Sequence, residues 1–286
     1  MRFLNVHHAH ENIARLTGAL SGEYPSMNTI DRAYRRVISH MREFAAPTMS
    51  IRISFKDDAW GEFLVANQVF ENVLEGLEDT PEHKRQLWKH QFQEALSYTR
   101  EQFPDLGRLV DLVLTDVVLF SSKNKGGGSG SHVPGLASIS PGDDWQVHDF
   151  AESTVHEVVH LNVFLADMVH RLYKEPADVL AEQNNRVVSA VKFGQMRPLD
   201  KAFHSAVVAP PLMLMQARRG ETELLDKFRA SLRECTDGLL DKYELFTPYG
   251  QVLVDELRVF TDSYDLDLVE ESISGTKFAH YELAAG

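Results

Sequence analysis

The sequence has a single cysteine, Cys235, so no disulfide can form within the chain. It also lacks an apolar run that could cross a bilayer, because the longest near-candidate, 206–215, is short and is interrupted by Pro210 and Pro211. The first residues carry no apolar stretch of the kind that a secretory signal needs. These absences predict a soluble cytoplasmic protein that does not bind a membrane.

Positive charge is scarce as well. The chain has 29 Lys and Arg against 42 Asp and Glu, which gives a formal net charge of −13. Nucleic-acid binding requires a surplus of positive charge to neutralise phosphates, so the composition argues against that class of partner. A basic or neutral peptide remains open as a partner. At 286 residues, 43% of them apolar, the chain can form one large domain or two smaller ones.

Apolar residues recur at helical spacing through most of the chain. The clearest start is Thr80-Pro81-Glu82, which combines a capping residue, a proline at the first position and an acidic first turn, and this helix is expected to end near Phe103. Further helices are expected over 29–44, over 60–77, from Pro198 to a break or kink at Pro210-Pro211, over 222–243 and from Thr247 through 257.

Two segments favour strands instead. Residues 112–120 are rich in β-branched and aromatic side chains, and residues 135–140 alternate apolar and small polar side chains. The glycine-rich stretch 124–131 between them lacks the order of a phosphate-binding loop and is expected to be a flexible surface loop or a lid. The expected fold is mainly α with a small β-sheet (α+β). An N-terminal helical region, 1–108, would precede a metal-binding catalytic region, 109–286, within one continuous domain.

The most informative motif is the H-E-x-x-H pattern that begins at His156, continues with Glu157 and ends at His160. Helix positions i and i+4 share a face, so both imidazoles can reach one metal ion, with Glu157 beside it. Valines at 155, 158, 159 and 163 indicate a buried helix, in which these polar side chains would be costly without a shared partner. The motif therefore predicts a metal site on a buried helix and not in a cupin barrel.

A zinc or iron site needs a third protein ligand. The extended peptidase pattern, with a glycine and a further histidine, is absent because residues 161–166 read Leu-Asn-Val-Phe-Leu-Ala. His170 is a poor candidate because it lies about 15 Å beyond His160 along the helix axis. His148 would need a break in the helix near Asp149. The remaining candidates are His204, Glu175, Glu182, Glu221 and Glu223.

Several short motifs occur together in a fixed order. Pro134-Gly135 precedes a short strand, the H-E-x-x-H motif follows, Arg197-Pro198-Leu199 leads to His204, and residues 245–250 read Leu-Phe-Thr-Pro-Tyr-Gly. This combination resembles the HExxH-type peptide β-hydroxylases, which depend on iron(II) and α-ketoglutarate. The resemblance covers roughly residues 109 to 257, and the helical N-terminal region adds nothing diagnostic.

The resemblance implies that His156, His160 and His204 hold Fe(II), with α-ketoglutarate and O2 at the open positions. The reaction would be β-hydroxylation of a residue in a ribosomally synthesised peptide, either with or without a leader segment. This ligand set departs from the usual two-histidine, one-carboxylate triad. Either His204 replaces the carboxylate, or an acidic residue completes the site.

Arg197 lies seven residues before His204, so on a continuous helix it would share the face of that histidine. Its guanidinium would then bind the distal carboxylate of α-ketoglutarate, whereas the simpler reading is a surface arginine at a helix start. Glu157 would orient a ligand or a water molecule in an oxygenase. In a zinc metallopeptidase, the alternative function, it would be the general base. A non-catalytic binding protein with a structural metal is a third reading. The modified side chain and the oligomeric state stay open.

Overall fold

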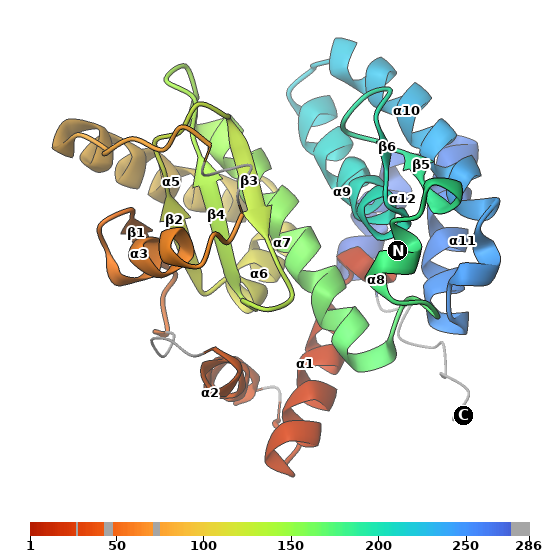
Figure 1. Cartoon of the computed structure of the whole chain (residues 1–286), viewed down its shortest axis with the longest axis horizontal. Coiled ribbons are helices and arrows are strands. Elements are labelled where there is room, and N and C mark those ends of the chain that lie inside the picture. The colour runs from red at the N-terminus through yellow and green to blue at the C-terminus, as the bar shows by residue number, and fades with distance from the viewer. Residues whose placement is uncertain (27, 43–47, 71–74, 276–286) are drawn as a thin grey trace. The chain divides into compact units, whose positions relative to one another are not determined.

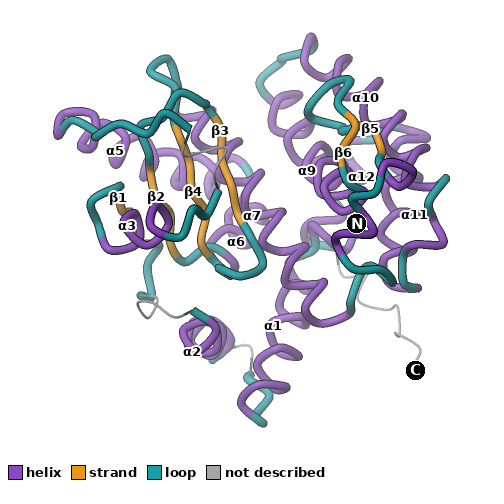
Figure 2. Tube along the Cα trace, in the orientation of Figure 1, coloured by secondary structure: helices purple, strands orange, loops and turns teal. Residues whose placement is uncertain are grey.

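The computed structural model describes residues 1–26, 28–42, 48–70 and 75–275 (Figure 1). Most of these residues are helical, and two small sheets account for the strands (Figure 2), so the expected mainly α, α+β fold class is confirmed. The chain divides into two compact units, one formed by His10–Leu165 and the other by Met1–Ala9 with the described residues from Ala166 onward. The division between the units falls within helix α7 (Val147–His170). Residue 108, where the N-terminal helical region was expected to end, lies inside α6 (Pro104–Val113).

The unit His10–Leu165 contains an open four-stranded sheet in the order β1-β2-β4-β3. Its strands are β1 (Arg52–Phe55), β2 (Asp116–Leu119), β3 (Gly126–Ser129) and β4 (Leu136–Ser140). The strands β1, β2 and β4 are parallel, and β3 runs antiparallel to β4 with Gly127 opposite Ile139. Strands β1 and β3 are therefore the two edges of the sheet.

Both faces of this sheet are covered. Helix α3 (Ala59–Ala66) packs Trp60 and Leu64 against Val118 and Leu136 on one face. Because strand side chains alternate, their neighbours in β2 and β4 point to the opposite face, and all of these are buried. Helices α5 (Glu82–Gln102), α6 and α7 lie on that second face (Figures 1 and 2). The unit also contains α2 (Ile30–Met41) and most of α1 (Val6–Ser21).

The structure confirms the helix expected from Thr80 to Phe103 as α5, and α2 lies within the segment predicted over 29–44. The helix predicted over 60–77 is shorter than expected, because α3 ends at Ala66 and residues 67–70 form turns, while residues 71–74 lie outside the described residues. The strand expected over 112–120 is shorter than predicted, because α6 occupies the chain up to Val113. A proline at the first position starts this additional helix, and its apolar residues recur at helical spacing on a buried face. The strand expected over 135–140 is confirmed as β4.

The second unit is mainly helical. Its elements are η1 (Arg2–Leu4), α8 (Ala177–Leu180), η2 (Gln183–Asn185), β5 (Val187–Val188), β6 (Met196–Arg197), α9 (Leu199–Arg218), α10 (Glu223–Leu240), η3 (Tyr243–Leu245), α11 (Pro248–Ser263) and α12 (Leu266–Ser274). Helix α11 begins where predicted, and the Thr247 hydroxyl accepts a hydrogen bond from the Gly250 amide. No described helix of either unit has both the length and the apolar character needed to span a membrane.

Helix α9 differs from the sequence prediction. Of the end or kink expected at Pro210-Pro211, the end is wrong, since the helix continues through both prolines to Arg218. Each proline removes one backbone N–H from the helix interior. However, α9 is buried almost throughout and packs against α10 and α12. Tertiary packing therefore offsets the intrinsic cost of the two prolines.

Candidate metal centre

The two histidines of the H-E-x-x-H motif meet on one face of α7, a continuous helix of 24 residues. Nε2 of His156 lies 3.0 Å from Nε2 of His160, and the two rings are nearly perpendicular, at 86°. Bonds from histidine nitrogen to zinc or a similar metal are about 2.0–2.1 Å long, and two such bonds meeting at roughly a right angle would place the nitrogens this far apart. The pair therefore fits a single metal ion, and the half-buried His156 side chain (26% exposed) leaves it accessible.

Glu157 points away from solvent, and its side chain is only 2% exposed. One carboxyl oxygen, Oε1, lies 4.0 Å from Nε2 of His156, and the other, Oε2, accepts a hydrogen bond of 2.7 Å from the Ser129 hydroxyl. Burial raises the pKa of Glu157 to about 8, and the hydrogen bond from Ser129 opposes that rise. A carboxyl group that exchanges a proton near neutral pH thus lies beside the histidine pair.

The glycine-rich stretch holds this carboxyl group in place. The flexible loop or lid predicted there is wrong, because residues 126–129 form strand β3, which is hydrogen-bonded to β4. A side chain at Gly127 would place its Cβ only 2.4 Å from Oε1 of Glu157. Glycine is depleted in strands, which is why composition favoured a loop, but here it permits the close approach of a buried side chain.

Ser129 is a residue of the candidate site that sequence reasoning missed, because its hydroxyl donates to Glu157. It lies two residues after Gly127, so both face the same side of β3, toward Glu157. The signal was a serine two residues after a glycine, in a segment next to the alternating strand β4, but it is interpretable only once the antiparallel pairing of β3 with β4 is known.

Replacing Gly127 with alanine is expected to move the Glu157 carboxyl group and to weaken its hydrogen bond from Ser129. Because loss of a supporting contact around a metal ligand typically costs 10- to 100-fold, we expect metal affinity to fall by about tenfold, with a stability loss of about 1–3 kcal/mol. Competition with a chelating dye and urea unfolding measure the two effects.

Gly128→Ala is the matched control, since its Cβ would face Phe70 on the other side of the strand, at 3.1 Å. This variant should change stability without changing metal affinity. Equal metal affinity in the wild type and Gly127→Ala would contradict the role given to the glycine.

The other candidate ligands occupy varied positions. His204 is buried on α9 in the second unit, with its ring edge-on to Phe203. Its role as third ligand stays a prediction. The break near Asp149 that His148 would need is not present, because α7 is continuous from Val147 to His170 and holds His148 about 12 Å from His156 along the axis. His170 stacks on Tyr249, with ring centroids 4.1 Å apart.

The carboxylate candidates are no better placed. Glu221 pairs with Arg219, Glu175 and Glu182 are exposed, and the side chain of Glu223 lies outside the described residues. Across the described ranges, no group of three or more His, Cys, Asp or Glu side chains is arranged to hold a metal ion.

Arg197 does not lie on the helix of His204. It belongs to strand β6, opposite Val187, and α9 begins only at Leu199, so the expectation of a shared helix face is wrong. The intervening proline, with φ of −45° and ψ of 146°, separates the strand from the helix. Arg197 is half-buried, and its guanidinium has no hydrogen-bond or ion-pair partner in the part of the chain that the structure describes. This is compatible with an anion-binding role.

Comparison of the chain with protein-family models and with curated proteins found no match.

Proposed function

We propose that this protein is an iron(II)- and α-ketoglutarate-dependent oxygenase that hydroxylates the β-carbon of a residue in a peptide. The observation that carries the proposal is the convergence of His156 and His160, whose Nε2 atoms lie 3.0 Å apart on an accessible helix face. These two histidines would hold the metal, with His204 as the third ligand. When bound, iron(II) with α-ketoglutarate and O2 supplies the conversion of a C–H bond into an alcohol, with release of succinate and CO2.

The chain's own residues support this chemistry in two ways. The Glu157 carboxyl group is fixed by Ser129 and lies beside His156, so it can orient that imidazole or a nearby water molecule. The Arg197 guanidinium offers a planar set of donors for the distal carboxylate of α-ketoglutarate. The resemblance to the peptide β-hydroxylases supplies the substrate class, a ribosomally synthesised peptide.

A zinc metallopeptidase is the second candidate. Two observations favour it: burial raises the pKa of Glu157 to about 8, and its Oε1 lies 4.0 Å from Nε2 of His156, a proposed metal ligand. A carboxylate of that basicity suits a general base that removes a proton from a water molecule during peptide hydrolysis. The two candidates thus differ in the role of Glu157.

Metal identity and product separate the two functions. Metal-free protein is loaded anaerobically with Fe(II) or with Zn(II), and α-ketoglutarate and O2 are then added. The proposal expects succinate with iron and none with zinc, and a mass gain of one oxygen atom in a peptide substrate. Peptide cleavage with zinc that disappears in Glu157→Ala, without any succinate from the iron-loaded protein, would instead establish the peptidase.

Arg197→Ala should raise the KM for α-ketoglutarate by at least about tenfold with a smaller change in kcat, because a charged hydrogen-bonding pair contributes about 1.5–3 kcal/mol to binding. Arg186→Ala is the control, since that guanidinium donates to backbone carbonyl oxygens. An unchanged KM in Arg197→Ala would remove Arg197 from the site while leaving the oxygenase assignment intact.

A further inference from the structure

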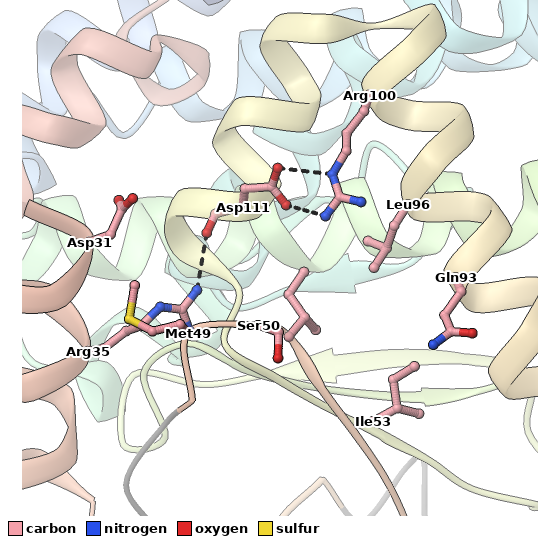
Figure 3. A pocket seen from close by; sticks show the side chains of 10 residues that line it. Asp31, Arg35, Met49, Ser50, Ile53, Gln93, Leu96, Arg100 and Asp111 are labelled. Carbon is pink, nitrogen blue, oxygen red and sulfur yellow. Dashed lines mark hydrogen bonds and ion pairs between the residues drawn. The ribbon is translucent and has the colours of Figure 1, made fainter. Parts of the chain in front are cut away.

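A pocket of about 390 Å³ opens in the unit His10–Leu165, beside the edge strand β1 (Figure 3). Its apolar wall includes Ile51, Ile53 and Leu96, and helices α2, α5 and α6 supply its charged residues. The volume falls within the range of small-molecule sites, about 300–1,000 Å³. Because β1 and β3 are opposite edges of the sheet, this pocket is separate from the Glu157 carboxyl group that β3 supports.

Arg35 on α2 is the unusual residue of this pocket. It is only 6% exposed, and its guanidinium donates hydrogen bonds to the backbone carbonyl oxygens of Thr48 (2.8 Å) and Asp111 (3.4 Å). Carbonyl oxygens satisfy donors but carry no net charge to balance the guanidinium. Among the described residues no carboxylate forms an ion pair with Arg35, and burial lowers its pKa. No carboxylate of the described residues lies within ion-pair distance of this buried charge, and Asp31 and Asp116 raise its pKa only from farther away.

A second buried arginine shows what compensation looks like. Arg42, at the end of the same helix, donates to the Asp116 carboxylate at 2.7 Å, and both side chains are at most 1% exposed. Buried charges are normally paired in this way. Arg35 departs from the pattern that its neighbour follows.

The two carboxylates that line the pocket, Asp31 and Asp111, do not form an ion pair with Arg35. Asp111 directs both side-chain oxygens to Arg100, at 3.0 and 2.6 Å, and offers Arg35 only its backbone carbonyl (Figure 3). Asp31 is exposed one turn earlier on α2 and acts on Arg35 only at longer range. Within the residues that the structure describes, the space beside Arg35 thus has a positive group, apolar walls and no carboxylate within ion-pair distance of the guanidinium.

We propose that this pocket binds a small molecule with an apolar body and one carboxylate, and that the carboxylate pairs with Arg35. A guanidinium has five N–H donors, and the two carbonyl contacts leave others for a ligand. The apolar body would contact Ile51, Ile53 and Leu96. Partial desolvation in the pocket strengthens the ion pair relative to one at the surface.

Benzoate and its neutral analogue benzamide test the proposal on the full-length protein. The Arg35 Nε–Hε signal and the Ile53 amide signal are followed by NMR during titration. We expect benzoate to bind at least about tenfold more tightly than benzamide, as a charged hydrogen-bonded pair implies. Equal affinity for the two probes, or no binding of benzoate, would overturn the proposal.

Two substitutions, one that removes a positive charge and one that removes a negative charge, test whether the carboxylate of benzoate pairs with Arg35. Arg35→Gln should abolish the preference for benzoate, whereas Asp31→Asn should increase benzoate affinity about twofold by removing a competing negative charge. If Arg35→Gln does not fold, the affinity of Asp31→Asn for benzoate relative to benzamide tests the proposal, because Asp31 is exposed and its loss should leave the fold intact. A preference that is unchanged in Asp31→Asn, or that persists in folded Arg35→Gln, would place the carboxylate elsewhere.

Discussion

Replacing Asp116 with alanine is expected to lower the free energy of unfolding by about 3–5 kcal/mol, because it would leave the Arg42 guanidinium buried without a counter-charge. Arg42 and Asp116 are 1% and 0% exposed, and their ion pair measures 2.7 Å. The same guanidinium donates to the Pro134 carbonyl at 2.8 Å and to the Thr115 hydroxyl at 2.6 Å. This single side chain therefore joins the end of α2, the start of β2 and the turn before β4.

Urea unfolding measures the loss, and Asp143→Ala is the matched control in the same unit. The Asp143 side chain is 80% exposed and pairs with Lys84, so its loss should cost at most about 1 kcal/mol. Removing both charges, in Arg42→Met with Asp116→Ala, should recover part of the stability, since an apolar pair avoids the unpaired buried charge. A loss in Asp116→Ala no larger than that in Asp143→Ala would contradict the structural role of the pair.

The structural features that could be predicted from the sequence are those that depend on neighbouring residues. The capping residue before α11 and the proline that begins this helix indicated where it starts, as did the proline and acidic residue at the start of α5. The convergence of His156 and His160 followed in the same way from a helical spacing of four. Each of these features depends on residues within one or two helical turns.

The features that escaped prediction depend on contacts between distant segments. Strand β1 pairs in parallel with β2, more than sixty residues later, and β3 is stabilised by a strand and a helix that follow it. Gly127 could not be recognised as a strand residue before Glu157 was known to lie against it. The prolines in α9 likewise indicate a break locally, whereas burial on several sides maintains the helix.

This difference bears on the candidate site. The motif placed two candidate ligands and Glu157 on one helix, but the hydroxyl that hydrogen-bonds Glu157 and the glycine that permits its close approach come from β3, a strand assigned to a loop on composition. The ion pair of Arg42 with Asp116 fixes the start of β2, and β4 and then β3 follow β2 in the strand order of the sheet. The position of the Glu157 carboxyl group is thus set by tertiary contacts, which no local pattern in the sequence describes.

Replacing His156 with alanine is expected to lower the affinity for Fe(II), and for Zn(II) as a probe, by more than about 100-fold. The loss of a residue that merely supports a metal ligand already costs about 10- to 100-fold, and loss of a ligand itself should exceed that. Calorimetry on metal-free protein measures the affinity. Because the His156 side chain is 26% exposed, the metal-free variant should unfold at nearly the wild-type temperature.

His148→Ala provides the control on the same helix, since that half-exposed side chain lies in the first turn of α7 and should not change metal affinity. Thermal unfolding gives a second measure that does not depend on catalysis. Excess metal should raise the melting temperature of the wild type and of His148→Ala, but not of His156→Ala, because only a folded state that binds metal is stabilised by it. His204→Ala should behave like His156→Ala if it supplies the third ligand. Wild-type affinity in His204→Ala would return that position to the acidic candidates, whereas wild-type affinity in His156→Ala would remove the metal centre itself.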